Sequence, residues 1–119
     1  KEFDFPYLCR RMLVNGISLP NYLNISGKKP WEIRHHDTLE MWKFGDRKNY
    51  TSLDLLATIF NIPSSKNGID GSMVNHAYYN DKKLDSIVEY CKRDVQVLAQ
   101  LFLKMHNIPL PKEENMYTL

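Results

Sequence analysis

A long amphipathic helix near the end of the chain is the feature that most constrains the fold. Apolar side chains recur at helical spacing from residue 81 to about residue 106. They are Leu84, Ile87, Val88, Cys91, Val95, Leu98, Leu101, Phe102 and Met105. Such a face needs a hydrophobic core, and 119 residues of which 43% are hydrophobic can form one domain or part of one.

Tyr90 and Asp94 lie four residues apart within this helix, so they share one face, which is expected to differ from the apolar one. A phenol and a carboxylate at this spacing are most often a structural surface pair. They are also the groups with which a metal-dependent hydrolase holds a cation and orients a water molecule. The helix alone favours the structural interpretation.

The beginning of the chain predicts a second helix. Asp4 stands two residues before Pro6 and an apolar run, which is typical of a helix start with Asp4 as the N-cap. Leu8, Met12 and Leu13 are expected to form its buried face, and the pair at residues 15–16, Asn-Gly, predicts its end. Asp4 stands between two phenylalanines, a position that also suits a metal ligand at the rim of a pocket.

The middle of the chain alternates loops with short elements. Residues 18–31 predict a loop, residues 33–37 a strand, and residues 39–42 a short helix. A hydroxyl cap at Thr51-Ser52 opens a helix that ends near Asn61, and residues 63–72 form a Ser/Asn/Gly-rich loop. Residues 73–80 predict another short helix that leads into the long one.

The run His35-His36-Asp37 contains residue types that bind metals. On a strand, consecutive side chains point to opposite faces, so the two histidines cannot easily share one ion. We therefore expect no histidine metal site here and keep only Asp37 as a residue of interest.

Charge and composition place weak limits on function. The net charge is +2, with nine Lys/Arg against six Asp/Glu in residues 1–48 and seven against eight in residues 49–119. This pattern is compatible with phosphate contacts but is no strong nucleic-acid footprint. Cys9 and Cys91 lack metal-type spacing and are expected to be reduced core residues. The sequence shows neither a leader nor an apolar run of membrane-spanning length, so a cytoplasmic protein is expected.

Two stretches resemble motifs of a known family. The segment Phe3-Asp4-x-Pro6-Tyr7-Leu8-x-x-Arg11 resembles the second exonuclease motif of the proofreading domain of family B DNA polymerases. Tyr90-Cys91-x-x-Asp94-x-x-x-Leu98 resembles the third motif, in its Tyr-x-x-x-Asp form, and the order and the separation of 90 residues also match. Residues 70–72, Asp-Gly-Ser, look like the free-standing bacterial relatives. The chain thus resembles a 3′–5′ exonuclease of the DEDD superfamily, tyrosine subclass.

The resemblance implies an α/β fold of the ribonuclease H-like type. It covers the later part of the family's domain, because the first motif, Asp-x-Glu, does not precede Asp4. We therefore expect a helix-rich C-terminal part that lacks most of the central sheet. Residues 1–107 would belong to the exonuclease domain and residues 108–119 would form a loosely held tail. With its central strands absent, such a chain would expose apolar helix faces and associate with itself.

The resemblance also implies a site and a reaction. Asp4 and Asp94 would bind metal, with Mg²⁺ or Mn²⁺ as the cofactors of a two-metal site that is incomplete in this chain. Tyr90 would orient the attacking water. Phe3 and Phe5 would stack on terminal bases or simply pack in the core, and Arg11 would serve structure or the substrate backbone.

The expected function is metal-dependent 3′–5′ hydrolysis of single-stranded DNA, with RNA as the alternative substrate, in the longer parent protein. The chain by itself is expected to have little or no activity. One alternative is a catalytically incompetent module of the same fold that binds nucleic acid or acts as a scaffold. The other is a helical interaction domain that matches the motifs by chance.

Overall fold

The computed structural model describes residues 3–63 and 71–112, which contain helices and connecting loops but no strand. The chain divides into two compact units, residues 1–41 and residues 42–119. Each unit is described by itself below.

The first unit consists of helix α1 and a long returning loop. Helix α1 spans Asp4–Val14 and begins without a side-chain cap, with Phe3 rather than Asp4 at the N-cap position. Gly16, at a φ of +68°, ends it: the Gly16 amide donates to the Leu13 carbonyl and the Ile17 amide donates to the Met12 carbonyl. This is the Schellman arrangement, and it confirms the predicted end of the helix.

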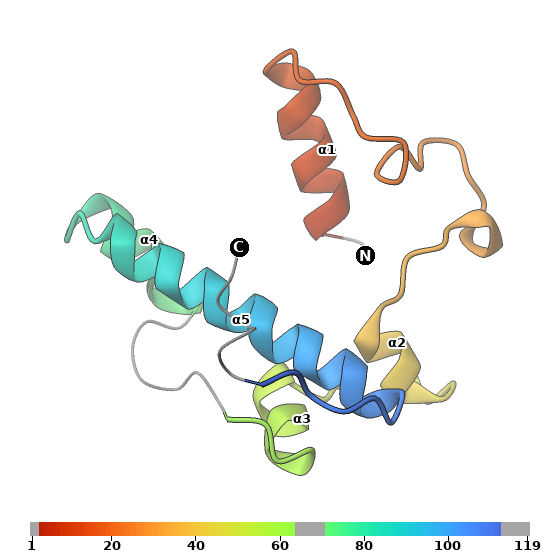
Figure 1. Ribbon diagram of the computed structural model, residues 1–119. Coiled ribbons are helices and arrows are strands. Elements are labelled where there is room, and N and C mark those ends of the chain that lie inside the picture. Colours follow the sequence, from red (N-terminus) through yellow and green to blue (C-terminus); the bar gives the residue numbers. More distant parts are fainter. Residues whose placement is uncertain (1–2, 64–70, 113–119) are drawn as a thin grey trace. The chain divides into compact units, whose positions relative to one another are not determined.

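The loop after α1 folds back on that helix (Figure 1). Leu23 is buried, and its carbonyl accepts a hydrogen bond of 3.5 Å from the Cys9 thiol. The predicted buried face of α1 is wrong for Leu8 and Leu13, which are exposed, while Met12 is half-buried. The other half-buried side chains of α1 are Phe5, Pro6 and Cys9.

The predicted strand at residues 33–37 is wrong. Residues 30–32 form the 3₁₀ turn η1 (Pro30–Glu32), and the following residues are irregular although the backbone at Ile33 is extended. A β-strand needs a hydrogen-bonded neighbour, and no strand lies anywhere in the described parts of the chain to supply one. The expected short helix does follow, as α2 (Thr38–Lys43).

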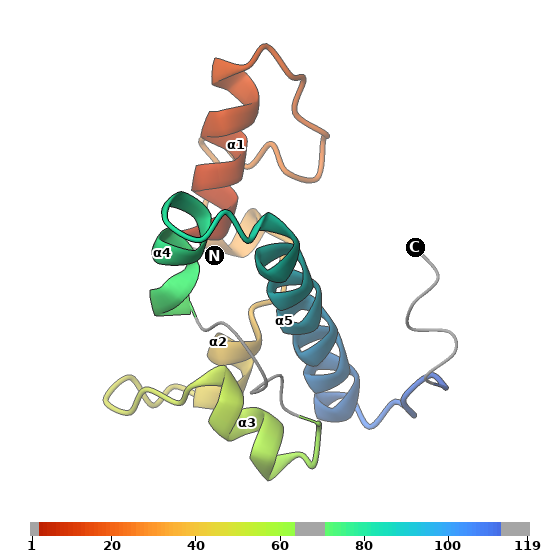
Figure 2. The ribbon, with the colours of Figure 1, turned by 90° about the vertical axis from the view of Figure 1, so that its left-hand side faces the viewer.

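The second unit is built around α5 (Leu84–Met105), which matches the predicted long helix. Helix α3 (Leu53–Ile59) packs against its C-terminal half, and α4 (Val74–Tyr79), preceded by the 3₁₀ turn η2 (Gly71–Met73), lies along its N-terminal half (Figures 1 and 2). The core lies between α3 and the C-terminal half of α5. Its buried members are Leu56, Ala57, Ile62, Val97 and Leu101, with Trp42, Leu53, Phe60 and Met105 packed around them.

Local signals explain where the helices of this unit begin and end. The Ser52 hydroxyl accepts a hydrogen bond of 3.2 Å from the Leu55 amide and caps α3, as predicted. Asn61 and Asn107 adopt positive φ values of 53° and 54° after α3 and α5, where each ends its helix as Gly16 ends α1. Asparagine tolerates this left-handed conformation better than most residues do.

Candidate functional site

Tyr90 and Asp94 lie on the inward-facing stripe of α5. Ile87, Tyr90 and Asp94 are half-buried, and Val97 and Leu101 continue the same stripe as fully buried core residues. The expectation that the pair occupies a face apart from the core is therefore wrong. A phenol and a carboxylate on a packed helix face are held more firmly than on a free surface, which suits groups that must be positioned.

A second apolar stripe of α5 is exposed. It comprises Leu84, Val88, Cys91, Val95 and Leu98, which the sequence also assigned to the buried face. Val95 is 65% exposed, whereas Val97, two residues further on, is 6% exposed. The prediction that Cys91 is a core residue is wrong for the same reason.

The Tyr90 hydroxyl lies beside Gly71. A Cβ atom added at Gly71 would lie 3.5 Å from the Tyr90 oxygen, so the phenol reaches the start of η2. Helix α4 contacts both η2 and α5, so packed elements surround this end of the site. The Asp-Gly-Ser segment at residues 70–72 thus borders Tyr90 through Gly71, while Asp70 lies outside the described residues.

Asp4 is the first residue of α1 and is exposed. Phe3 is 74% exposed and its ring stacks on Tyr7, with centroids 6.0 Å apart. Phe5 is half-buried and stacks on His35, with centroids 4.2 Å apart and an interplanar angle of 16°. Arg11 is exposed in the last turn of α1. The exposed ring of Phe3 is compatible with base stacking although it also lies against Tyr7, whereas Phe5 is half-buried against His35.

Comparison with known proteins decides the family. A family model described as a predicted 3′–5′ exonuclease related to the exonuclease domain of PolB matches residues 1–117. The chain belongs to this family. Membership implies a ribonuclease H-like exonuclease fold and a nucleic acid substrate, and it excludes a chance match of the two motifs in an unrelated helical domain. No curated protein and no solved structure matched the chain.

The metal donors that the exonuclease family requires are incomplete in the described residues. Asp94 lies in one unit and Asp4 in the other, and a joint site formed by the two stays a prediction. Within residues 3–63 and 71–112, no three His, Cys, Asp or Glu side chains gather closely enough to hold an ion. The oxygen chemistry of Asp94 suits Mg²⁺ or Mn²⁺, but one carboxylate does not make a site for a cation that demands near-octahedral geometry.

Asp37, which the sequence marked as a residue of interest, caps a helix. Its Oδ1 atom accepts hydrogen bonds from the Leu39 amide at 3.0 Å and the Glu40 amide at 3.3 Å, at the N-terminus of α2. The pKa of the Asp37 carboxyl lies below its ordinary value. Burial acts to raise this pKa, while hydrogen bonds to the carboxylate, among them those from the Glu40 and Leu39 amides, act to lower it.

None of the described helices is a candidate membrane span, and even the longest of them, α5, is not apolar enough to cross a bilayer.

Proposed function

We propose that this protein takes part in metal-dependent 3′–5′ hydrolysis of single-stranded nucleic acid, either DNA or RNA. The observation that supports this most strongly is the placement of Tyr90 and Asp94. They lie one turn apart on the packed stripe of α5, in a chain whose family is that of exonucleases.

In this proposal, each of the three site residues has a separate task. Asp94 and Asp4 are metal ligands for Mg²⁺ or Mn²⁺, and the Tyr90 hydroxyl hydrogen-bonds the attacking water. A divalent cation would supply charge neutralisation at the scissile phosphate and a more acidic water. Because Tyr90 is half-buried on α5 and its hydroxyl lies near Gly71, we expect the hydroxyl to need little reorganisation to hold that water.

The remaining metal ligands have to come from elsewhere. The 119 residues contain no Asp-x-Glu pair, and the two aspartates of the proposal do not complete a two-metal site. We therefore propose that activity requires further carboxylates, and that these 119 residues by themselves hydrolyse nucleic acid slowly or not at all. The assays below use the natural protein in which this sequence occurs.

The test is a cleavage assay on a single-stranded oligonucleotide that carries a fluorophore at its 5′ end. The expected result is a ladder of labelled products shortened from the 3′ end, formed only with Mg²⁺ or Mn²⁺. Asp94→Asn should slow this reaction by about 100-fold or more, because it removes a charged metal ligand while keeping the side-chain shape. Asp85→Asn is the matched control, since Asp85 is an exposed aspartate on the same helix.

Two results would contradict the proposal. Equal rates for the wild type and Asp94→Asn would remove Asp94 from the site. Binding of the oligonucleotide without cleavage under any divalent cation would favour the alternative, a nuclease-fold module that only binds nucleic acid.

A further inference from the structure

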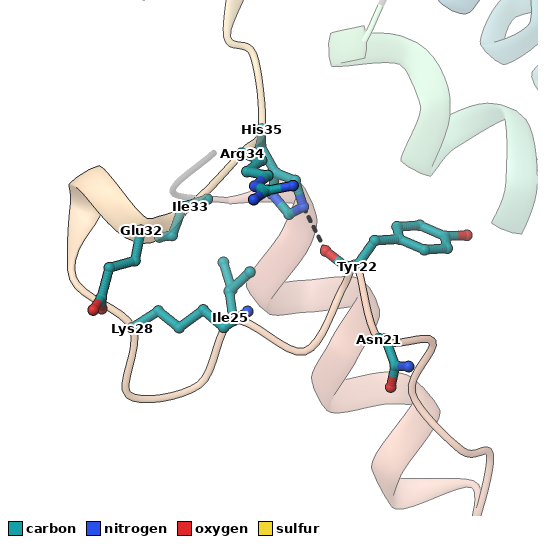
Figure 3. Close-up of a pocket in the computed structure, with 8 residues that line it drawn as sticks. All are labelled: Asn21, Tyr22, Ile25, Lys28, Glu32, Ile33, Arg34 and His35. Atoms are coloured by element: carbon teal, nitrogen blue, oxygen red, sulfur yellow. Dashed lines mark hydrogen bonds between the residues drawn. The ribbon is translucent and has the colours of Figure 1, made fainter.

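The loop between α1 and α2 encloses a pocket that the proposed catalytic residues do not use. Its volume is about 640 Å³, within the range of small-ligand sites in proteins. The pocket is formed by residues 21–35, and Tyr22, Ile25, Lys28, Glu32, Arg34 and His35 are among its lining residues (Figure 3). All of them belong to the first unit.

The charge of this pocket is positive. Lys28 and Arg34 enter from two separate stretches of the loop, and Glu32 is the single carboxylate among the residues that line the pocket. The Glu32 Oε2 atom accepts a hydrogen bond of 2.7 Å from the Lys29 amide, so part of its charge is already satisfied by the backbone. The pocket therefore suits an anion.

His35 fixes one wall of the pocket. Its Nε2 atom lies 2.6 Å from the Tyr22 carbonyl oxygen, and because a carbonyl only accepts, Nε2 carries the proton (Figure 3). The His35 ring is also held by α1, because the ring of Phe5 stacks on it. The hydrogen bond between His35 and Tyr22 closes a loop of thirteen residues, and the stacking on Phe5 anchors this loop on α1. These two contacts preform the pocket.

The second ring nitrogen of His35 makes no hydrogen bond in the described structure. This nitrogen, Nδ1, is also buried.

The non-ionic lining suits a nucleobase. Ile25 and Ile33 give the pocket an apolar wall, whereas the Tyr22 ring points away from these two residues and is 72% exposed (Figure 3). Proteins that bind single strands combine cationic side chains for the phosphates with apolar and aromatic surfaces for the bases. Two cations beside an apolar wall therefore suit a nucleotide better than a simple inorganic anion.

We propose that this pocket is a nucleotide subsite that binds one nucleotide of a single strand. Lys28 and Arg34 bind its phosphate, and its base lies against Ile25 and Ile33. The subsite lies outside the two exonuclease motifs and would hold the strand by its backbone. The proposal rests on the proposed function only in taking nucleic acid as the ligand.

The test compares two double variants that lose the same charge. Lys28→Ala/Arg34→Ala removes the proposed phosphate contacts, and Arg47→Ala/Lys48→Ala removes two exposed cations in the other unit. Affinity for a fluorescent short oligothymidylate is measured by anisotropy at low and moderate salt. Binding of thymidine monophosphate is followed through the ring resonances of His35 by NMR, and Mn²⁺-dependent cleavage is measured in parallel.

We expect the pocket variant to bind the oligothymidylate about tenfold more weakly at low salt, with a smaller salt dependence. The control variant should stay within about twofold of the wild type, and thymidine monophosphate should shift the His35 resonances. If the affinity for the oligothymidylate fell equally in both variants, the subsite would be contradicted. Such a result would show that these cations attract the strand through non-specific charge effects. Unchanged His35 resonances at saturating nucleotide would overturn it too.

The parallel assay separates this proposal from the proposed function. Cleavage by the wild type with unaltered binding in Lys28→Ala/Arg34→Ala would leave the exonuclease intact and remove the subsite. Pocket-dependent binding without cleavage would support the subsite and contradict the proposed function.

Discussion

The hydroxyl of Tyr90 lies so close to Gly71 that a Cβ atom at position 71 would be 3.5 Å from it. This distance is an ordinary van der Waals contact, and Gly71 does not have a positive φ. Gly71→Ala should therefore fold normally and keep activity within a fewfold of the wild type. Gly71→Leu should displace the phenol and reduce cleavage much more strongly.

The Gly71 variants are compared by thermal unfolding and by cleavage rate. Equal activity of Gly71→Ala and Gly71→Leu would show that the neighbourhood of Tyr90 and Gly71 has no part in the reaction. A large loss in Gly71→Ala, without loss of stability, would show that the space beside the hydroxyl is itself needed.

Tyr90→Phe removes one oxygen and keeps the ring that packs on the inward stripe of α5. We expect at least a tenfold lower kcat, because the attacking water loses a hydrogen-bond partner. Affinity for single-stranded DNA should be unchanged, and the free energy of unfolding should change by no more than about 1 kcal/mol. The measurement is single-turnover cleavage beside equilibrium binding, and full activity of this variant would exclude the proposed role.

Val97 and Val95 offer a matched test of which stripe of α5 faces the core. Val97→Ala should lower the free energy of unfolding by about 2 kcal/mol, because it removes two buried methyl groups and leaves a cavity beside Leu101. Val95→Ala, at an exposed position, should change it by less than about 0.5 kcal/mol. Urea unfolding measures both, and a reversed order would contradict the packing described here.

Asp37 makes the stability of α2 depend on pH. Its pKa is lowered in the folded protein, so its contribution is fully present above the unfolded pKa of about 3.9 and is lost as the pH falls through the folded value. Asp37→Ala should cost about 1 kcal/mol at pH 7, and this difference from the wild type should shrink below about pH 4.

Asn is a good N-cap residue without a titrating group, so Asp37→Asn is the control. It should keep most of the stability at pH 7, and unfolding curves across this pH range measure the comparison. A cost of Asp37→Ala that does not vary with pH would show that the cap does not depend on the carboxylate charge.

The exposed stripe of α5 predicts self-association of the chain. Leu84, Val88, Val95 and Leu98 form an apolar row along four turns, and contiguous apolar surface of this kind commonly marks an interface. Val95→Lys/Leu98→Lys should shift the chain toward a monomer in sedimentation experiments. A wild-type chain that stays monomeric at high concentration would contradict this prediction.

The helix boundaries were predictable because their causes are local. The Ser52 cap, the Asn-Gly end of α1 and the asparagine that ends α3 are each visible in a few neighbouring residues. The strand at residues 33–37 was wrong because a strand depends on a partner that is distant in sequence. The apolar pattern of α5 contains two adjacent stripes, and periodicity does not say which of Val95 and Val97 the rest of the chain covers.

The candidate site was predictable only in part. Helical spacing predicts that Tyr90, Asp94, Val97 and Leu101 share one face, but not that this face, rather than the stripe of Val88 and Val95, is the one that is covered. The pocket at residues 21–35 escaped sequence reasoning, although Lys28 and Arg34 stand close to Tyr22 and Trp31 in a loop with little regular structure. Its closure depends on the contact between His35 and Tyr22, which no local pattern predicts.

The most direct test of the exonuclease proposal is the distance between the Asp4 and Asp94 carboxylates in a crystal structure of the natural protein with Mn²⁺. Two ions of such a site lie about 4 Å apart, so both carboxylates should lie within about 8 Å of each other, with Mn²⁺ bound to Asp94. The Tyr90 hydroxyl should then face the same ion. Carboxylates separated by much more than this distance, or Mn²⁺ bound without Asp94, would contradict the proposal.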